Sequence, residues 1–178
     1  MTIDEKYMCR CLQLARKGEG FVRPNPMVGA IIVHENRIIG EGYHRKFGEP
    51  HAEVNAINAV IDPSLLKEST LYVSLEPCTH YGKTPPCTEF IISKKIPRVV
   101  IATMDPNLMI SGKGIQRMRN AGIEIKEGVL EKEAKELNRV FFVNQLCKRP
   151  YIILKWAQSS DGYIDIIRSS LAETPPVK

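Results

Sequence analysis

The chain has 178 residues, of which 43% are hydrophobic and 25% are charged, so it is long enough for one domain, with or without an appendage, that buries a full core. No apolar run could cross a bilayer, and the charged N-terminus lacks the features of a secretory signal, so we expect a cytoplasmic protein without membrane contact. The net charge of +5 permits an anionic ligand, but the 7% aromatic content and the scattered basic residues do not indicate nucleic-acid binding.

The spacing of apolar residues predicts helices and strands that alternate after an initial hairpin. The expected order is a helix that begins at the capping box 2–5 and ends before Gly18, hairpin strands 28–34 and 37–43, a helix that opens at 51 and ends at 62–63, strand 71–75, a helix from 87, strand 98–103, helix 115–121, strand 123–125 and helix 130–146. This alternation predicts one mostly parallel sheet covered by helices.

Residues 147–178 differ from the rest of the chain. We interpret 148–150 as a linker and 151–154 as one further apolar strand, and the remainder is polar. We therefore expect one complete domain at 1–146, with a linker and the start of a second domain at 147–178. Without a sheet to join, the strand 151–154 is expected to stay disordered, to pack on the first domain or to pair with another chain.

Three residues form a pattern typical of a metal site, namely His51, Cys78 and Cys87. Imidazole nitrogen and thiolate sulfur are ligands that Zn²⁺ accepts, and three protein ligands leave a fourth position open for water. Because two thiolates offset the charge of the ion, a nearby base must help to deprotonate that water. Glu53 can take this proton and deliver it to a ring nitrogen and then to departing ammonia. In a regular helix residues two apart diverge by roughly 200°, so convergence of His51 and Glu53 requires a helix that begins at His51.

Other interpretations of these residues are open from the pattern alone. A histidine at a helix start is often a cap or a surface group, and single cysteines are often small buried hydrophobic residues. A structural zinc would need a fourth protein ligand such as His80. The His-x-Glu and Pro-Cys elements match the signature of zinc deaminases, but that signature places its second cysteine where this chain has Tyr81. The eight-residue gap before Cys87 therefore indicates a subgroup.

The sequence resembles the deaminase half of the bifunctional riboflavin biosynthesis deaminase and reductase over about residues 5 to 162. The motifs that carry the resemblance are Pro-Asn-Pro-Met-Val-Gly at 24–29, Gly-Glu-Gly-Tyr-His at 40–44, Pro-His-Ala-Glu at 50–53, the segment 75–87 with both cysteines, and Asp-Pro-Asn at 105–107. The eight-residue gap is this family's own pattern. The resemblance implies a three-layer α/β/α cytidine-deaminase-like fold, with a mixed sheet, an N-terminal hairpin and helices on both faces.

The resemblance also implies a set of substrate contacts. Asn25, His44 and His80 are expected at the pyrimidine, and Lys83, Asp105 and Asn107 at ribose or phosphate. From the residues alone, Asn25 and the segment 105–107 are equally consistent with turns, and His44 with a surface position at a strand end. Residues 111–114, before a predicted helix, are a second candidate for an anion site, because a helix N-terminus attracts anions.

These observations predict a zinc-dependent hydrolase that removes an exocyclic amine from a phosphoribosylated diaminopyrimidinone, a small molecule. We expect a homo-oligomer. Residues 150–162 resemble the first strand and loop of the family's reductase domain, and about 30 residues cannot build a nicotinamide-binding domain, so reductase activity is expected to be absent. The alternatives are a deaminase of bases in nucleic acids or nucleosides, and a non-catalytic module stabilised by zinc.

Overall fold

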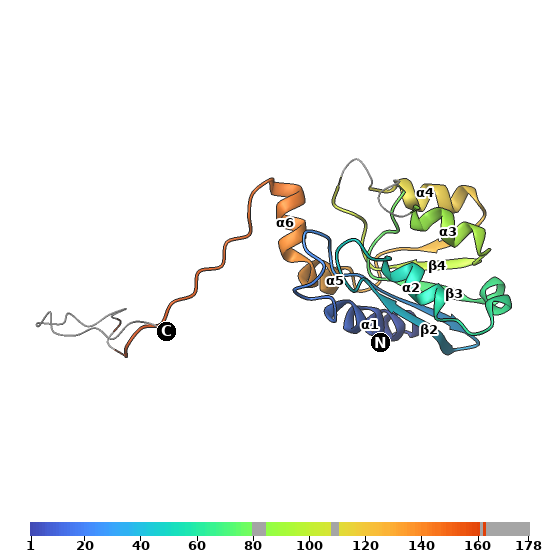
Figure 1. Cartoon of the computed structure of the whole chain (residues 1–178), viewed down its shortest axis with the longest axis horizontal. Helices are drawn as coiled ribbons and strands as arrows, with labels where there is room; N and C mark the ends of the chain where they lie inside the picture. Colours follow the sequence, from blue (N-terminus) through green and yellow to red (C-terminus); the bar gives the residue numbers. More distant parts are fainter. Residues whose placement is uncertain (80–84, 108–110, 161, 163–178) are drawn as a thin grey trace, which may run out of the picture.

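The computed structural model describes residues 1–79, 85–107, 111–160 and 162. The expectations for His80 and Lys83 therefore lie outside the described residues. A sheet lies between two layers of helices, and the chain leaves this body after the last helix (Figure 1). The elements are α1 (Ile3–Arg16), β1 (Gly29–His34), β2 (Arg37–Tyr43), α2 (Ala52–Asn58), the 3₁₀ helix η1 (Pro63–Glu68), β3 (Thr70–Val73), α3 (Cys87–Ser93), β4 (Arg98–Ile101), α4 (Lys113–Asn120), β5 (Glu124–Lys126), α5 (Glu131–Leu137) and α6 (Arg139–Cys147).

Five strands form one mixed sheet in the order β2-β1-β3-β4-β5. Strand β1 is antiparallel to both β2 and β3, whereas β3, β4 and β5 are parallel. The sheet is thus mixed, as the resemblance implied, rather than mostly parallel, as the alternation alone predicted. Because β3 and β4 are parallel neighbours, their C-terminal ends lie at the same edge of the sheet, which is where open α/β sheets bind ligands.

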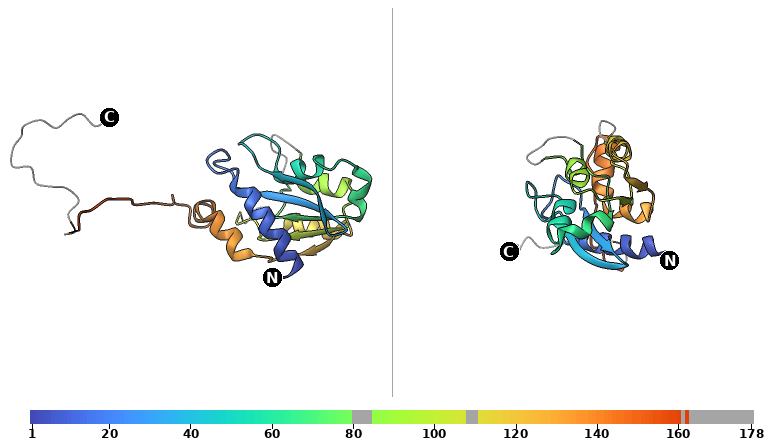
Figure 2. Two further views of the ribbon diagram at one scale, coloured as in Figure 1. Left: turned by 90° about the horizontal axis from the view of Figure 1, so that it is seen from below. Right: turned by 90° about the vertical axis from the view of Figure 1, so that its right-hand side faces the viewer.

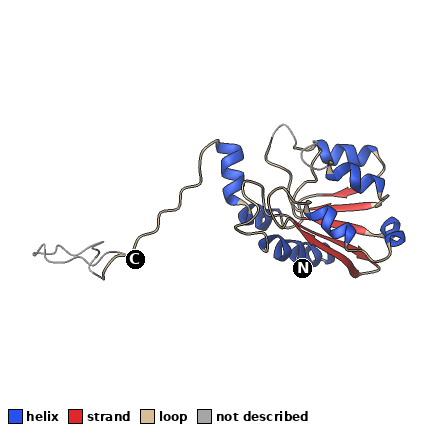
Figure 3. Cartoon of the chain, in the orientation of Figure 1, coloured by secondary structure: helices blue, strands red, loops and turns tan. Residues whose placement is uncertain are grey.

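The inner strands β1, β3 and β4 bury both of their faces, and alternate residues belong to different cores. On β1, Ala30 and Ile32 belong to the core that includes residues of α2, α3 and α4, while Ile31 and Val33 belong to the core that includes residues of α1 and α5. This period of two is the geometry of an extended strand. Figure 3 shows the strands between the two helical layers, and Figure 2 shows α1 running along one face of the sheet. The predicted three-layer arrangement is confirmed.

Glycines allow the helices to approach the hairpin closely. A Cβ atom on Gly42 would lie 2.3 Å from the Ala56 backbone nitrogen of α2, and one on Gly29 would lie 2.0 Å from the Cys11 carbonyl oxygen of α1. Any larger residue at either position would push a helix away from the sheet. The contact at Gly42 therefore fixes the position of α2, whose first turn contributes to the functional site.

The prediction of one long helix at 130–146 is wrong, because the helix is interrupted at Asn138. Asn138 has φ −106° and ψ 23° and separates α5 from α6. Its buried side chain accepts a hydrogen bond from the Met27 amide (2.8 Å) and donates one to the Met27 carbonyl (2.8 Å). The apolar spacing continues across the break, so it gave no sign that Asn138 pairs with a distant backbone segment.

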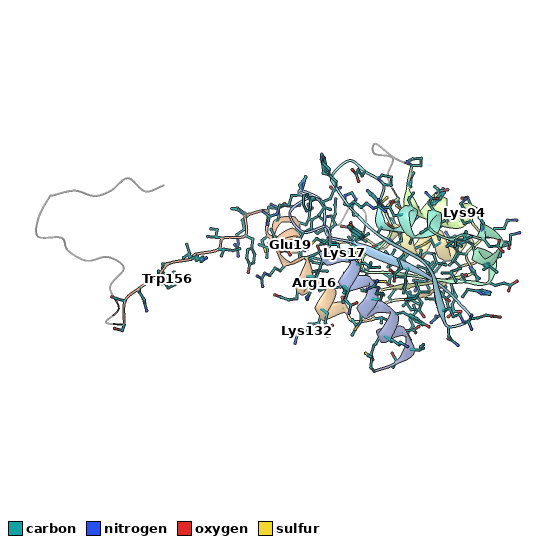
Figure 4. The ribbon with its side chains drawn as sticks, turned by 60° about the horizontal axis from the view of Figure 1, so that its bottom comes forward. Arg16, Lys17, Glu19, Lys94, Lys132 and Trp156 are labelled. Carbon is teal, nitrogen blue, oxygen red and sulfur yellow. The ribbon has the colours of Figure 1, made fainter. Side chains whose placement is uncertain are left out.

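The predicted strand 151–154 is also absent, since residues 151–158 have no regular secondary structure. Ile152, Ile153 and Leu154 are 69%, 70% and 77% exposed, so this segment does not pack on the domain. Figure 4 shows Trp156 on an extended segment well away from the helices and strands. A strand needs a neighbour for its backbone hydrogen bonds, and these residues have none in the described part of the chain. The boundary at 146 stays a prediction. Within the described residues, no helix is long and apolar enough to cross a membrane.

Candidate metal centre

His51 lies immediately before α2, and its backbone is extended (φ −70°, ψ 168°) while Ala52 and Glu53 are helical. His51 therefore occupies the N-cap position of α2, as one interpretation proposed, but its imidazole forms no capping hydrogen bond. Its Nδ1 atom instead lies 3.6 Å from Cys78 Sγ and 3.3 Å from Cys87 Sγ. Because the helix begins just after His51, the His51 and Glu53 side chains line the same cavity. The helix start at this position is the feature that the sequence analysis required for the two side chains to converge.

The two cysteines reach His51 from different elements. Cys78 lies beyond the C-terminal end of β3, and Cys87 is the first residue of α3. The Cys87 amide donates a hydrogen bond to Cys78 Sγ (3.4 Å). The amide and the hydroxyl of Thr88 both donate to the Cys78 carbonyl oxygen (3.2 and 3.1 Å). These contacts hold the start of α3 against the end of β3 and so fix the two sulfurs relative to each other.

The two thiols ionise at very different pH values. A hydrogen bond from the Cys87 thiol lowers the pKa of Cys78 to about 4, helped by its hydrogen bond with His51 and opposed by burial. The same hydrogen bond, together with burial, raises the pKa of Cys87 well above its usual value. The hydrogen bond with Cys78 raises the pKa of His51. Cys78 is therefore the more acidic of the two thiols, and the thiolate is the form that binds metal ions.

The three side chains fit a tetrahedral zinc ion. Zn–S distances of about 2.3 Å and Zn–N distances of about 2.0–2.1 Å place nitrogen and sulfur ligands about 3.6 Å apart in a tetrahedral site. The observed nitrogen-to-sulfur distances are 3.6 and 3.3 Å, and all three ligand atoms lie within 4.8 Å of one another. In the part of the chain that the structure covers, no fourth His, Cys, Asp or Glu joins this group. Among the described residues, the donor set therefore has the composition and spacing of a three-ligand zinc site.

Glu53 lies beside the ligands without belonging to the group. It is only 3% exposed, and burial raises the pKa of its carboxyl group to about 7, although the nearby His51 opposes this shift. A carboxyl group with this environment can both accept and release a proton near neutral pH. Its position on the first turn of α2 directs it into the cavity that His51 and Cys78 also line.

A cavity of about 300 Å³ opens beside the metal ligands, at the lower end of the size range of small-molecule sites. The structure brings four of the six predicted substrate contacts to this cavity, and the other two, His80 and Lys83, lie outside the described residues. The residues that line it are Asn25, Pro26, Val28, His44, His51, Glu53, Leu75, Glu76, Cys78, Asp105, Asn107, Phe141 and Gln145.

His44 is held in one orientation within this cavity. It is 2% exposed, and burial lowers the pKa of its imidazole. Its Nδ1 lies 3.3 Å from the Pro50 carbonyl oxygen and its Nε2 lies 3.2 Å from the Asn25 amide nitrogen. A neutral ring with the proton on Nδ1 satisfies both contacts, because Nδ1 then donates and Nε2 accepts. The interpretation of His44 as a surface residue is therefore wrong, and Asn25 is more than a turn residue.

Sequence reasoning missed four residues at this site. Phe141 and Gln145 lie one turn apart on α6 and line the cavity, and Asn138 binds the backbone of Met27, two residues after Asn25. Glu76 is buried at the wall of the cavity, and among the described residues its hydrogen-bond donors are all backbone amides. A glutamate directly before Pro-Cys was the available signal for Glu76. For α6, no local pattern marked the helix as part of a site.

The family model for the cytidine and deoxycytidylate deaminase zinc-binding region matches residues 1–103 of this chain. The chain belongs to this deaminase family. The match includes His51, Glu53, Cys78 and Cys87, and it ends before Asp105. Membership supports a zinc-binding function for the His-Cys-Cys group and confirms the prediction of a deaminase.

Individual relatives place the chain more narrowly within the family. It is 54% identical over 168 residues to the riboflavin biosynthesis protein RibD of Aquifex aeolicus, covering 94% of this chain and 47% of the relative. It is 47% identical over 139 residues to the diaminohydroxyphosphoribosylamino-pyrimidine deaminase of Buchnera aphidicola, covering 78% of this chain and 93% of the relative. The recognition as a RibD-type deaminase domain is confirmed. Apart from the Buchnera protein, the chain spans about half the length of the first curated relatives it matches.

Solved structures agree with this assignment. The structure of Acinetobacter baumannii RibD matches with a TM-score of 0.86 and 43% identity, covering 89% of this chain and 44% of that one. The Aspergillus oryzae Rib2 deaminase, solved in complex with DARIPP, matches with a TM-score of 0.64 and 26% identity, covering 81% of this chain and 94% of that one. The predicted cytidine-deaminase-like fold is confirmed.

Proposed function

We propose that the protein binds one zinc ion and hydrolyses 2,5-diamino-6-(5-phosphoribosylamino)pyrimidin-4(3H)-one to 5-amino-6-(5-phosphoribosylamino)uracil and ammonia. Water supplies the new carbonyl oxygen and two protons, of which one ends on the ring nitrogen and the other on the amine, which leaves as ammonia. The observation that carries the proposal is the convergence of His51 Nδ1 with the two cysteine sulfurs, with buried Glu53 in the same cavity. The names of the Buchnera and Aspergillus relatives support the substrate class.

His51, Cys78 and Cys87 would hold the zinc ion. Zinc in a three-ligand site supplies Lewis acidity that activates water at neutral pH. Glu53 would take a proton from the attacking water and deliver it first to the ring nitrogen and then to the departing amine. Because the buried Glu53 side chain lies next to the ligands, each transfer would occur over a short distance and away from bulk water.

The remaining cavity residues would orient the substrate. The Asn25–His44 pair presents fixed hydrogen-bonding groups on one side of the cavity, where it would contact the pyrimidine. Asp105 and Asn107 lie beyond the C-terminal end of β4 and would contact ribose or phosphate. For His80 and Lys83 the support is the sequence motif alone. The segment 147–178 is proposed to lie outside this catalytic unit.

Ammonia release from the phosphoribosyl diaminopyrimidinone by the zinc-loaded protein tests this function, with cytidine and single-stranded DNA as alternative substrates. We expect release from the first compound only, loss of activity with a chelator and recovery with added zinc. Faster release from DNA, with binding that weakens steeply as salt increases, would favour a nucleic-acid deaminase instead. Absence of reductase activity stays a prediction, which oxidation of NADPH in the presence of the deaminated product would contradict.

A further inference from the structure

Glu76 is a buried carboxylate whose two oxygens are occupied by backbone amides. It is 4% exposed. One oxygen, Oε1, accepts hydrogen bonds from Gly114 (3.0 Å) and Ile115 (3.4 Å). The other oxygen, Oε2, accepts from Gly112 (2.9 Å) and Asp105 (3.2 Å). A carboxylate can accept two hydrogen bonds on each oxygen, so Glu76 satisfies four backbone donors, two in buried and two in partly buried hydrogen bonds, that no neutral side chain could satisfy together.

Three of these donors belong to the start of α4. The first amides of a helix have no partner within the helix, and here the Glu76 carboxylate provides one. The contact is close, because a Cβ atom on Gly114 would lie 2.4 Å from the Pro77 carbonyl oxygen and 3.1 Å from Glu76 Oε1. Residues 111–114 were a candidate for an external anion site, and the structure shows that the protein's own carboxylate binds there.

The fourth donor connects Glu76 to the substrate cavity. The backbone amide of Asp105 donates a hydrogen bond to Glu76, and the Asp105 carboxylate accepts one from the backbone amide of Asn107 (2.8 Å). The Glu76 amide in turn donates to the Thr103 carbonyl (2.9 Å). Asp105 and Asn107 line the cavity on one side of this connection, and Cys78 lies two residues from Glu76 on the other. One side chain therefore joins the end of β3 to the loop after β4.

We propose that Glu76 is a positioning residue for substrate binding, which holds residues 104–107 at a set distance from the metal ligands. The proposal rests on the function proposed above, because Asp105 and Asn107 are taken to bind the substrate away from the reacting ring carbon. The Cys87 amide donates to Cys78 Sγ, and the Thr88 amide and hydroxyl donate to the Cys78 carbonyl oxygen. These hydrogen bonds hold the cysteines independently of Glu76. Loss of the Glu76 carboxylate should therefore affect KM more than kcat.

Glu76→Gln tests the proposal in the zinc-loaded, full-length chain. The amide group keeps the length of the side chain, but its NH₂ group faces two backbone amides that need an acceptor. We expect KM for the phosphoribosyl diaminopyrimidinone to rise on the order of tenfold, with kcat within about threefold of wild type and an unchanged zinc content. Asp4→Asn is the matched control, since Asp4 is also a buried, hydrogen-bonded carboxylate (5% exposed) but lies outside the cavity. It should leave KM unchanged.

A double-mutant cycle with Asn107→Ala shows whether Glu76 acts through the loop. If it does, the combined variant raises KM by clearly less than the product of the two single effects. If the increase in KM in the double variant equals the product of the two single increases, the proposal is overturned. It is also overturned if Glu76→Gln loses zinc and kcat while its KM stays unchanged. Glu76→Asp, which keeps both oxygens one methylene shorter, should give an intermediate KM, and it carries the same test if Glu76→Gln does not fold.

Amide hydrogen exchange provides a test that needs no substrate. In Glu76→Gln, the amides of Asp105, Gly112 and Gly114 should exchange faster than in wild type, while the Thr88 amide, which donates to Cys78, should not change. Unchanged exchange at all four amides would overturn the proposal. An inactive wild-type protein would contradict the proposed function alone, because the exchange result would still report whether Glu76 holds the loop.

Discussion

Asp4 and Glu53 are both buried carboxylates in the first turn of a helix, but their surroundings are opposite. Asp4 accepts hydrogen bonds from Tyr72 (2.7 Å), Arg98 (3.2 Å) and Lys126 (2.7 Å), and we call these four residues the Asp4 cluster. Burial opposes ionisation of Asp4, but these three partners outweigh it and hold its pKa well below the usual range. At Glu53 burial dominates and raises the pKa to about 7.

The surroundings of Asp4 suit a role in stability, whereas those of Glu53 suit a role in proton transfer. The Asp4 cluster joins α1 to β3, β4 and β5 through a group that is ionised at neutral pH, which favours the folded state. Glu53 keeps a carboxyl group poised to exchange protons, and such perturbed groups are typical of active sites. The predictions below test whether substitutions at the two regions change different properties of the protein.

Glu53→Gln should have the largest effect. Glutamine cannot accept and return a proton, so kcat for ammonia release should fall on the order of 10³-fold, with zinc content and thermal unfolding unchanged. Glu49→Gln, an exposed position shortly before His51, is the control and should keep wild-type turnover. A Glu53→Gln protein that deaminates at the wild-type rate would exclude the proposed proton transfer and favour a non-catalytic zinc module.

Asn138→Ala should affect both stability and binding. It leaves the Met27 amide and carbonyl without their partner, and we expect the free energy of unfolding to fall by about 3 kcal/mol. Because Met27 follows the cavity-lining segment at Asn25, KM should rise as well. Urea unfolding and steady-state kinetics measure the two effects. Asn144→Ala, at an exposed position on α6, should change neither property, and equal losses in both variants would contradict the role of Asn138.

Asp4→Asn should have a smaller effect that is confined to stability. We expect the free energy of unfolding at neutral pH to fall by about 2 kcal/mol, with kcat and KM unchanged. Since the folded pKa lies below the unfolded value of about 3.9, this stabilisation is present above about pH 4 and is lost as the pH falls below it. Urea unfolding at pH 7 and at pH 3 should show that the difference in free energy of unfolding between wild type and Asp4→Asn is smaller at the lower pH. An equal difference at both pH values would indicate that the charge of Asp4 does not stabilise the cluster.

The metal centre could be predicted from the sequence because its residue types are rare in combination and its local geometry follows from short-range patterns. His51 and Glu53 share a helix start, and the strand before Cys78 predicted that its thiol would lie at the C-terminal edge of the sheet. The hairpin could also be predicted from local signals, but the order of the sheet was not predicted, and the alternation gave no sign that β1 is antiparallel to both of its neighbours.

The supporting contacts could not be predicted, because they join residues that are far apart in the chain. Asn138 and Met27 are separated by 111 positions, and Glu76 and Gly114 by 38. Both contacts are side chain to backbone, so neither partner position has a complementary side chain that would reveal the pair in the sequence. The break between α5 and α6 arises from such a contact, which explains why helical spacing alone predicted one helix.

The cavity draws its walls from two stretches of the chain. All four residues proposed to bind zinc or move protons precede residue 104, whereas Phe141 and Gln145 project from α6. Changes on α6 can therefore reshape the pocket without disturbing the reaction centre. Variation among related enzymes, and directed evolution toward new ring systems, would find most freedom on this helix, while the ligand-bearing segments tolerate little.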